Sequence, residues 1–266
     1  MANFKNIFRF TEWWMNASSA TFGTILGIVL TVGITYWQQM ENQKEMTRKI
    51  AKITLHNIDV RINSLKNSCE LLMKKDSIYG KLQSYMPDKL DNLPKDSLSQ
   101  CIHLLFYGDY GTHDTKSEEI FSSSFEVWQF LDDEKVIGRI SNCYSFLEMN
   151  EKFVKDIEQQ LTQYAFNTSA KIMTENTKYD ELKAANYYLK NPDVMTAYLK
   201  INYIPLIYSM ISTVQELNDK NKEVLGINQN ELDELSNLIG DDTKGMNYNI
   251  EEDSIQITKD IINKAD

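Results

Sequence analysis

The chain is poor in the residue patterns that catalytic and metal sites require. Its 266 residues include only 3 Cys and 3 His, and none of the Cys stands in a CxxC or Cys/His metal spacing. Cys69 and Cys143 fall on the apolar faces of predicted helices, where Cys commonly behaves as a small hydrophobe. No catalytic or cofactor motif rises above background. We therefore predict no catalytic, cofactor or metal residues, and a protein that is not an enzyme.

Positive charge is also scarce. The chain has 28 Lys and Arg against 38 Asp and Glu, which gives a net charge of −10. Residues 230–266 hold ten of the acidic residues and only three Lys, and so account for −7 of that charge. An acidic chain without a basic patch argues against nucleic acid as a partner. It also argues against the soluble part lying flat on an anionic leaflet.

Charge is missing altogether from the 28 residues between Trp13 and Met40. About 20 apolar helical residues cross the hydrocarbon core of a bilayer, and Ala17–Trp37 supplies 21. A charged group near the bilayer centre costs about 2.5–3.5 kcal/mol, so this stretch is well suited to lipid. Aromatic side chains that favour membrane interfaces flank it at both ends, namely Trp13, Trp14, Tyr36 and Trp37. The sequence predicts one transmembrane helix with the lipid bilayer as a partner.

Two other interpretations of this stretch are weaker. A buried core helix of a soluble protein is disfavoured by the length of the uncharged run and by its two aromatic ends. A cleaved signal peptide needs a shorter apolar region followed by small residues. Here the small residues Ala17–Ala20 precede the apolar core. We favour an uncleaved signal-anchor.

Small residues recur at every fourth position along this predicted helix and so form one stripe. Closely approaching helices in membranes use such small-residue contacts. We predict a helix–helix interface, and a homodimer formed through the membrane helix. The interface residues are Ser19, Gly23, Gly27 and Thr31, with Thr35 continuing the stripe.

The flanking charges disagree on orientation. The tail before the span carries Lys5 and Arg9, whereas the segment after it carries Lys44, Arg48, Lys49 and Lys52. A count of positive charges favours a cytoplasmic soluble domain. A short basic tail before a single apolar segment is nevertheless the usual layout of a signal-anchor. We favour a soluble domain outside the cytoplasm.

Beyond the span, the apolar spacing is that of helices, and the alternation typical of strands is nearly absent. No Pro or Gly interrupts 38–77, so a helix is expected over 38–75 with a break over 77–94. Apolar residues at alternating spacings of three and four predict one seam at Leu55, Ile58, Ile62, Leu65, Cys69 and Leu72. A second seam is predicted at Val136, Ile140, Cys143, Leu147, Asn150, Val154, Ile157, Leu161 and Tyr164.

Several helix ends are marked by capping residues. Thr115 and Glu118 have the spacing of a capping box. Asn191 before Pro192 marks a helix start, and Pro205 should kink or end that helix. Asn150 is expected to bond a neighbouring helix.

The resulting fold class is all-α, with an N-terminal transmembrane helix followed by an elongated helical bundle. We divide the chain into a short N-terminal tail (1–16), a transmembrane helix (17–37), a helical bundle domain (38–240) and an acidic C-terminal tail (241–266).

Ligand-capable side chains gather only in the loop 107–116. Asp109, His113 and Asp114, with His103 upstream, could bind a divalent metal. Their spacing matches no metal motif, and such residues are common in loops. A metal-dependent hydrolase using the 109–114 loop is therefore only a lower alternative.

Two stretches carry a resemblance to a known family: the span ending GIVLTVGITYWQQ (Gly27 to Gln39) and the run FEVWQFLDDEKVIGRISNCYSFLE (Phe125 to Glu148). The chain resembles a family of uncharacterised bacterial membrane proteins with a helical domain of unknown function. Trp37 matches the Trp of the Trp-Asn dipeptide that ends the span in that family, and Gln38 replaces the Asn. The resemblance implies a single-pass anchor in the bacterial inner membrane and supplies no catalytic residues.

Together these features predict a non-enzymatic interaction or scaffolding module on a single-pass anchor, which associates with itself and with a protein partner of unknown identity. The alternative is an extracytoplasmic sensor bundle that works with a separate signalling protein. An apolar cavity between the helices of residues 130–215 would favour the sensor.

Overall fold

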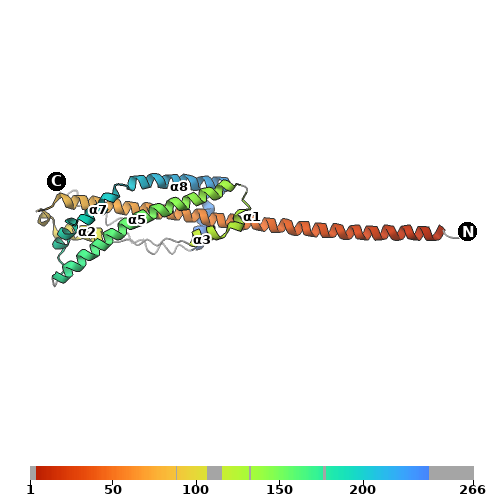
Figure 1. Ribbon diagram of the computed structural model, residues 1–266, viewed down its shortest axis with the longest axis horizontal. Helices are drawn as coiled ribbons and strands as arrows, with labels where there is room; N and C mark the ends of the chain where they lie inside the picture. Colours follow the sequence, from red (N-terminus) through yellow and green to blue (C-terminus); the bar gives the residue numbers. More distant parts are fainter. Residues whose placement is uncertain (1–3, 88, 107–115, 132, 176–177, 240–266) are drawn as a thin grey trace. The chain divides into compact units, whose positions relative to one another are not determined.

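The computed structural model describes residues 4–87, 89–106, 116–131, 133–175 and 178–239. For 4–27, 116–117, 125, 127 and 235–239 it describes the backbone alone. All regular secondary structure in the described ranges is helical, which confirms the all-α prediction (Figure 1). The predicted acidic tail 241–266 lies outside the described residues.

Contacts between Cα atoms divide the chain into two compact units. The first comprises 1–51 and 124–132, and the second comprises 52–123 and 133–266. The first unit contains the N-terminal part of helix α1 (Phe4–Ser84) and the short helix α4 (Phe125–Trp128). The second unit contains the helical bundle.

Helix α1 extends further than the spacing of Pro and Gly predicts. All six residues of its predicted seam are buried, so that prediction is confirmed. The predicted break at 77 is wrong, because the helix continues to Ser84 with Gly80 inside it. Tyr79 and Leu82 are buried on that last part. Their burial offsets the roughly 0.5–1 kcal/mol by which Gly disfavours a helix interior.

Helix α5 (Glu134–Glu175) carries the second seam. The predicted seam is buried from Val136 to Leu161. At its end Ala165 is buried in place of Tyr164. A straight helix drifts by about 20° per heptad against a 3.5-residue repeat. After four heptads from Val136 the drift approaches one residue, which moves the buried position from Tyr164 to Ala165.

Asn150 bonds its own helix. Its Nδ2 donates to the carbonyl oxygen of Phe146 at 2.6 Å, although its side chain is buried. The expected bond to a neighbouring helix is therefore wrong. A carbonyl four residues earlier lies on the same helix face, and it satisfies the amide locally.

The remaining helices are shorter. They are the 3₁₀ turn η1 (Leu90–Asn92), α2 (Lys95–Phe106), α3 (Lys116–Ser123), α6 (Glu181–Leu189), α7 (Pro192–Ile201), α8 (Ile204–Leu225) and α9 (Gln229–Ile239). The predicted cap is confirmed, since the side chain of Asn191 accepts a hydrogen bond from the backbone N–H of Asp193. Pro205 lies in the first turn of α8, and the chain breaks just before it as predicted. Gly226 ends α8 with a φ of 59°, a left-handed conformation that favours glycine.

Within the second unit, α5 is the central helix. It contacts α8, α7, α6 and α2, and Figure 1 shows α5 and α8 lying side by side. The buried seams of α1 and α5 and the inward residues of α6, α7 and α8 form the core. The bundle that the sequence predicts is therefore present.

The three thiols provide a test of this core. Cys69, Cys101 and Cys143 are all buried, and burial raises the pKa of Cys69 and of Cys143 from 9.0 to about 12. At about pH 8 a shift of about three pH units makes the reactive thiolate fraction roughly a thousandfold smaller. We expect the folded full-length chain to react with a colorimetric thiol reagent far more slowly than the same chain in denaturant.

In denaturant all three thiols should react, which provides the internal control. Fast reaction of Cys69 or Cys143 in the folded protein, identified by mass spectrometry, would contradict the packing of α1 against α5 and α8.

Candidate functional site

Buried charge gathers where α1, α3 and α5 meet. The Nε and Nη2 atoms of Arg61 donate to the two carboxylate oxygens of Glu151 at 2.9 and 2.6 Å. Nη1 donates to Oε2 of Glu118 at 2.7 Å. The side chains of Arg61 and Glu151 are each only 6% exposed, whereas that of Glu118 is 32% exposed. We call Arg61, Glu151, Glu118, Tyr144 and Asn57 the Arg61 cluster.

The apolar seams place these charges inside the protein. Arg61 follows the buried Ile58 by three residues and precedes the buried Leu65 by four. Glu151 follows the buried Leu147 by four residues. Residues three and four apart share one helix face. Burial of the seams therefore carries Arg61 and Glu151 out of water together.

Aromatic contacts complete the cluster. The guanidinium carbon of Arg61 lies 5.4 Å from the ring centroid of Tyr144, which is close enough for a cation–π contact. The Tyr144 hydroxyl donates to Oδ1 of Asn57 at 3.3 Å. Phe121 of α3 contacts the same tyrosine ring, with the centroids 5.5 Å apart. Helix α3 is thus joined to the bundle through Glu118 and Phe121.

The carboxylates keep Arg61 charged. Burial acts to lower the pKa of Arg61, but the hydrogen bonds and charges of Glu151, and then of Glu118, outweigh it and raise the pKa. Breaking a buried ion pair by removing one partner is costly, because a desolvated charge remains. The cluster is therefore a strong constraint on how α1, α3 and α5 fit together.

An open recess of about 550 Å³ lies beside the cluster. Small-molecule sites are mostly apolar with a few polar groups. This recess is lined by charged side chains of both signs and one hydroxyl, so it differs from the apolar cavity that the sensor alternative needs. The lining residues are Arg61, Glu118, Glu119, Ser122, Glu148, Glu151, Lys152 and Lys155.

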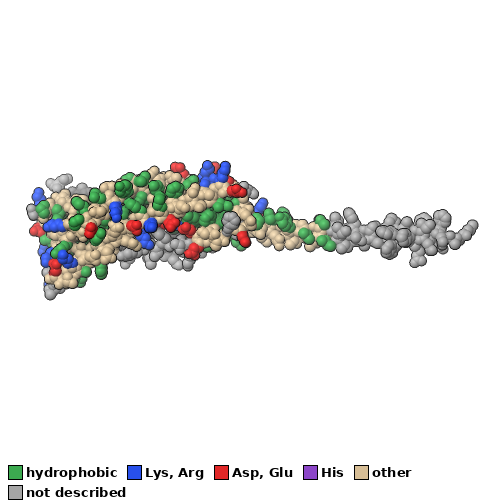
Figure 2. Space-filling model, viewed as in Figure 1, with side chains coloured by type: hydrophobic (Ala, Val, Ile, Leu, Met, Phe, Trp, Pro, Cys, Tyr) green, Lys and Arg blue, Asp and Glu red, His purple; other side chains and the backbone are tan. Residues whose placement is uncertain are grey.

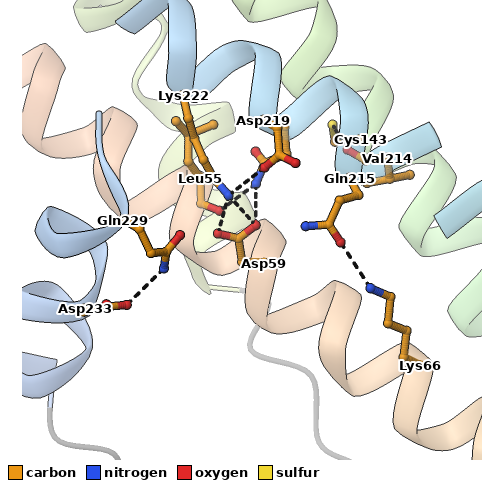
Figure 3. Close-up of polar contacts among 11 residues, drawn as sticks. Leu55, Asp59, Lys66, Cys143, Val214, Gln215, Asp219, Lys222, Gln229 and Asp233 are labelled. Atoms are coloured by element: carbon orange, nitrogen blue, oxygen red, sulfur yellow. Dashed lines mark hydrogen bonds and ion pairs between the residues drawn. The ribbon is translucent and has the colours of Figure 1, made fainter. Parts of the chain in front are cut away.

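A second polar cluster joins α1 to α8 (Figure 3). The Nζ atom of Lys222 lies 2.8 Å from Oδ2 of Asp59 and 3.1 Å from Oδ1 of Asp219. Nδ2 of Asn218 donates to Oδ1 of Asp59 at 2.8 Å and to the carbonyl oxygen of Leu55 at 3.1 Å. Burial lowers the pKa of Lys222, but Asp59 and then Asp219 outweigh that effect and raise it.

The two clusters hold α1 from different sides. Asp59 and Arg61 are two positions apart, which corresponds to about 200° around a helix. Asp59 pairs with α8, whereas Arg61 pairs with α5 and α3. Ionic contacts therefore hold helix α1 to α8 on one side and to α5 and α3 on the other.

An aromatic cluster joins α1, α2, α6 and α7. The rings of Tyr79 and Tyr198 stack with centroids 3.9 Å apart. The hydroxyls of Tyr198 and Tyr188 lie 3.5 Å apart. The ring of Phe106 contacts the ring of Tyr188, with the two centroids 4.9 Å apart. Burial raises the pKa of Tyr188 and of Tyr198, so both phenols stay protonated. These contacts fill the space between the helices with packed rings.

The predicted membrane residues are described only in part. The side chains of Trp13, Trp14, Ser19, Gly23 and Gly27 lie outside the described residues. At the other end of the predicted span, Tyr36 and Trp37 are each 65% exposed.

Two threonines of the predicted stripe are described. Thr31 is exposed. The hydroxyl of Thr35 donates a hydrogen bond to the carbonyl oxygen of Thr31 at 2.8 Å. Among the residues that the structure describes, no helix combines the length and apolar character needed to cross a bilayer. The predicted span begins at Ala17, before the first described side chain, that of Ile28.

The loop considered as a metal site also lies mostly outside the described residues. Asp109, His113 and Asp114 are among those left undescribed, and His103 is exposed on α2. In the described part of the chain, no group of His, Cys, Asp and Glu is placed to hold a metal ion.

Sequence reasoning missed both ionic clusters. The available signal was a charged residue at helical spacing from a buried seam, as for Arg61 and Glu151. Glu118 was expected to cap its own helix, but its carboxylate accepts a hydrogen bond from Arg61. Thr115, the other half of that capping box, lies outside the described residues.

Replacing Arg61 should strongly destabilise the bundle. Arg61→Ala leaves Glu151 buried without its partner, so we expect the free energy of unfolding to fall by about 3–5 kcal/mol. Lys49→Ala breaks an exposed pair with Glu45 and should leave stability nearly unchanged. Denaturant unfolding of the full-length chain, followed by circular dichroism, measures both changes.

Replacing Arg61 and Glu151 together by Met should recover much of the loss, because no unpaired charge is then buried. If Arg61→Ala unfolds at the same denaturant concentration as Lys49→Ala, the cluster does not hold the helices together.

Comparison of the chain with protein-family models, curated proteins and solved structures gave no match. The interpretation of the site therefore rests on its own contacts, and the resemblance to a bacterial membrane family stays a prediction.

Proposed function

We propose that the protein is a single-pass, membrane-anchored helical module that is not an enzyme and that acts by binding proteins, including a second copy of itself. The uncharged stretch Trp13–Met40 carries this proposal. In the described part of that stretch, apolar side chains are exposed at Ile28, Val29, Leu30, Val32 and Ile34. A helix that is apolar on all sides belongs in a protein core or in lipid.

The bundle supports a scaffolding role. Its helices are joined by a buried ion pair between α1 and α5, a half-buried one between α1 and α8, and stacked rings between α1 and α7. Helix α1 includes both the uncharged stretch and the first seam of the bundle. A rigid bundle on such a helix would present a fixed surface to partners near the membrane. We place that surface outside the cytoplasm, at the inner membrane of a bacterium.

The anchor is tested by membrane fractionation of the full-length chain. We expect the protein to pellet with membranes and to resist extraction by alkaline carbonate. Leu30→Arg combined with Ile34→Arg should release it, because each charge costs about 2.5–3.5 kcal/mol near the bilayer centre. Met46→Arg adds the same charge to an exposed apolar site beyond the span and should change nothing. Recovery of the unmodified protein in the soluble fraction would refute the anchor.

Self-association of the anchor is tested separately, in a membrane two-hybrid assay with the full-length chain. Gly23→Ile with Gly27→Ile fills the predicted contact stripe with bulky side chains and should abolish the signal. Gly33→Ile is the matched control, since Gly33 lies off the stripe and nothing approaches the position of an added Cβ within 4 Å. An unchanged signal from the double variant would show that the stripe is not the contact.

A further inference from the structure

A run of exposed apolar side chains crosses α7 and α8. Met195, Leu199, Tyr203 and Leu206 are spaced four, four and three residues apart, and each is 54–58% exposed. Met195 and Leu199 lie one turn apart on α7, Tyr203 directly precedes α8, and Leu206 lies in the first turn of α8. Figure 2 shows hydrophobic side chains gathered over α8 and the neighbouring part of α5. Burying such residues against a partner would remove apolar area from water.

Helix α5 widens this surface. Phe153 meets Tyr203 edge to face, with ring centroids 6.3 Å apart and planes at 86°. Met149, one turn earlier on α5, is half exposed. We call the set of Met149, Phe153, Met195, Leu199, Tyr203 and Leu206 the α7–α8 face.

Part of this surface, including Tyr203 and Leu206, belongs to an uncharged run. Residues 201–215 form a run of 15 without Asp, Glu, Lys or Arg, in a chain of which 25% is charged. Exposed Ser209, Ser212 and Thr213 supply hydroxyls along this run. Interface cores are depleted in charged residues and enriched in aromatic residues and Met. The composition of the α7–α8 face is that of a protein–protein interface.

We infer that the occupant of the α7–α8 face is the same face of a second copy of this chain. Two copies each carry a net charge of −10 and repel one another at most surfaces. A two-fold contact brings the same patch of each subunit together, so a contact centred on the uncharged run 201–215 avoids juxtaposing like charges.

This inference rests on the proposed function, because copies anchored in one membrane have a raised effective concentration. It adds a second contact to the one expected in the anchor, and it locates that contact on α7 and α8. Ser209 lies near the middle of the uncharged run, and the contact should therefore bring two copies of Ser209 close together.

Disulfide crosslinking of the full-length chain in membranes tests the inference. The native Cys are buried, so an introduced surface Cys is the reactive one. Ser209→Cys should give a covalent dimer on mild oxidation. Ser122→Cys, at another exposed serine, on α3, should give none. Absence of a Ser209→Cys dimer, or equal dimer from Ser122→Cys, would overturn the inference.

The apolar contact is tested by sedimentation of the full-length chain in density-matched detergent. Leu206→Glu buries a charge in each half of the proposed interface and should weaken dimerisation by about tenfold or more. Val60→Glu makes the same change at an exposed apolar residue of α1 and should leave dimerisation intact. Equal dissociation constants for both variants would overturn the inference.

Membrane fractionation of the unmodified protein and crosslinking of Ser209→Cys together separate the two proposals. If the unmodified protein is not membrane-bound but Ser209→Cys still crosslinks, the anchor fails and the α7–α8 face stands. If the protein is membrane-bound and Ser209→Cys does not crosslink, the face fails and the anchor stands.

Discussion

The cost of a desolvated positive charge governs the bundle. Arg61 is buried because the seam of α1 is buried, and its charge is tolerated only while Glu151 and Glu118 remain within hydrogen-bonding distance. Sliding α1 against α5 by one turn, about 5.4 Å, would leave both charges without partners in a water-poor interior. Apolar seams can pack in several registers, whereas the Arg61–Glu151 ion pair forms in only one register of α1 against α5. The polar cluster thus contributes specificity that the aliphatic core alone lacks.

Much of the fold follows from local rules. The spacing of aliphatic residues locates the buried faces of α1 and α5, and Asn191, Pro192 and Pro205 mark where helices begin. The errors occur where tertiary packing outweighs a local preference. Gly80 does not end α1, because the burial of Tyr79 and Leu82 holds the last turns in place. The seam of α5 moves from Tyr164 to Ala165, because a heptad count accumulates an angular error along a straight helix.

The site was harder to foresee because its partners are far apart in sequence. Arg61 and Glu151 are separated by 90 residues, and Asn218 and Leu55 by 163. Helical spacing can show that a charge lies on an apolar face, but it cannot show which opposite charge it meets. The α7–α8 face illustrates the converse case. The uncharged run 201–215, which includes Tyr203 and Leu206, is visible in the sequence, whereas the exposure of these two side chains emerges only in the folded bundle.

The two ionic contacts of α1 also have a mechanical consequence. Asp59 is tied to α8 and Arg61 to α5 and α3, from sides of the helix about 200° apart. Rolling α1 about its own axis would pull both side chains away from their partners in the same movement. The two contacts therefore oppose rotation of this helix within the bundle. Within the bundle, α1 is fixed in its rotation about its own axis.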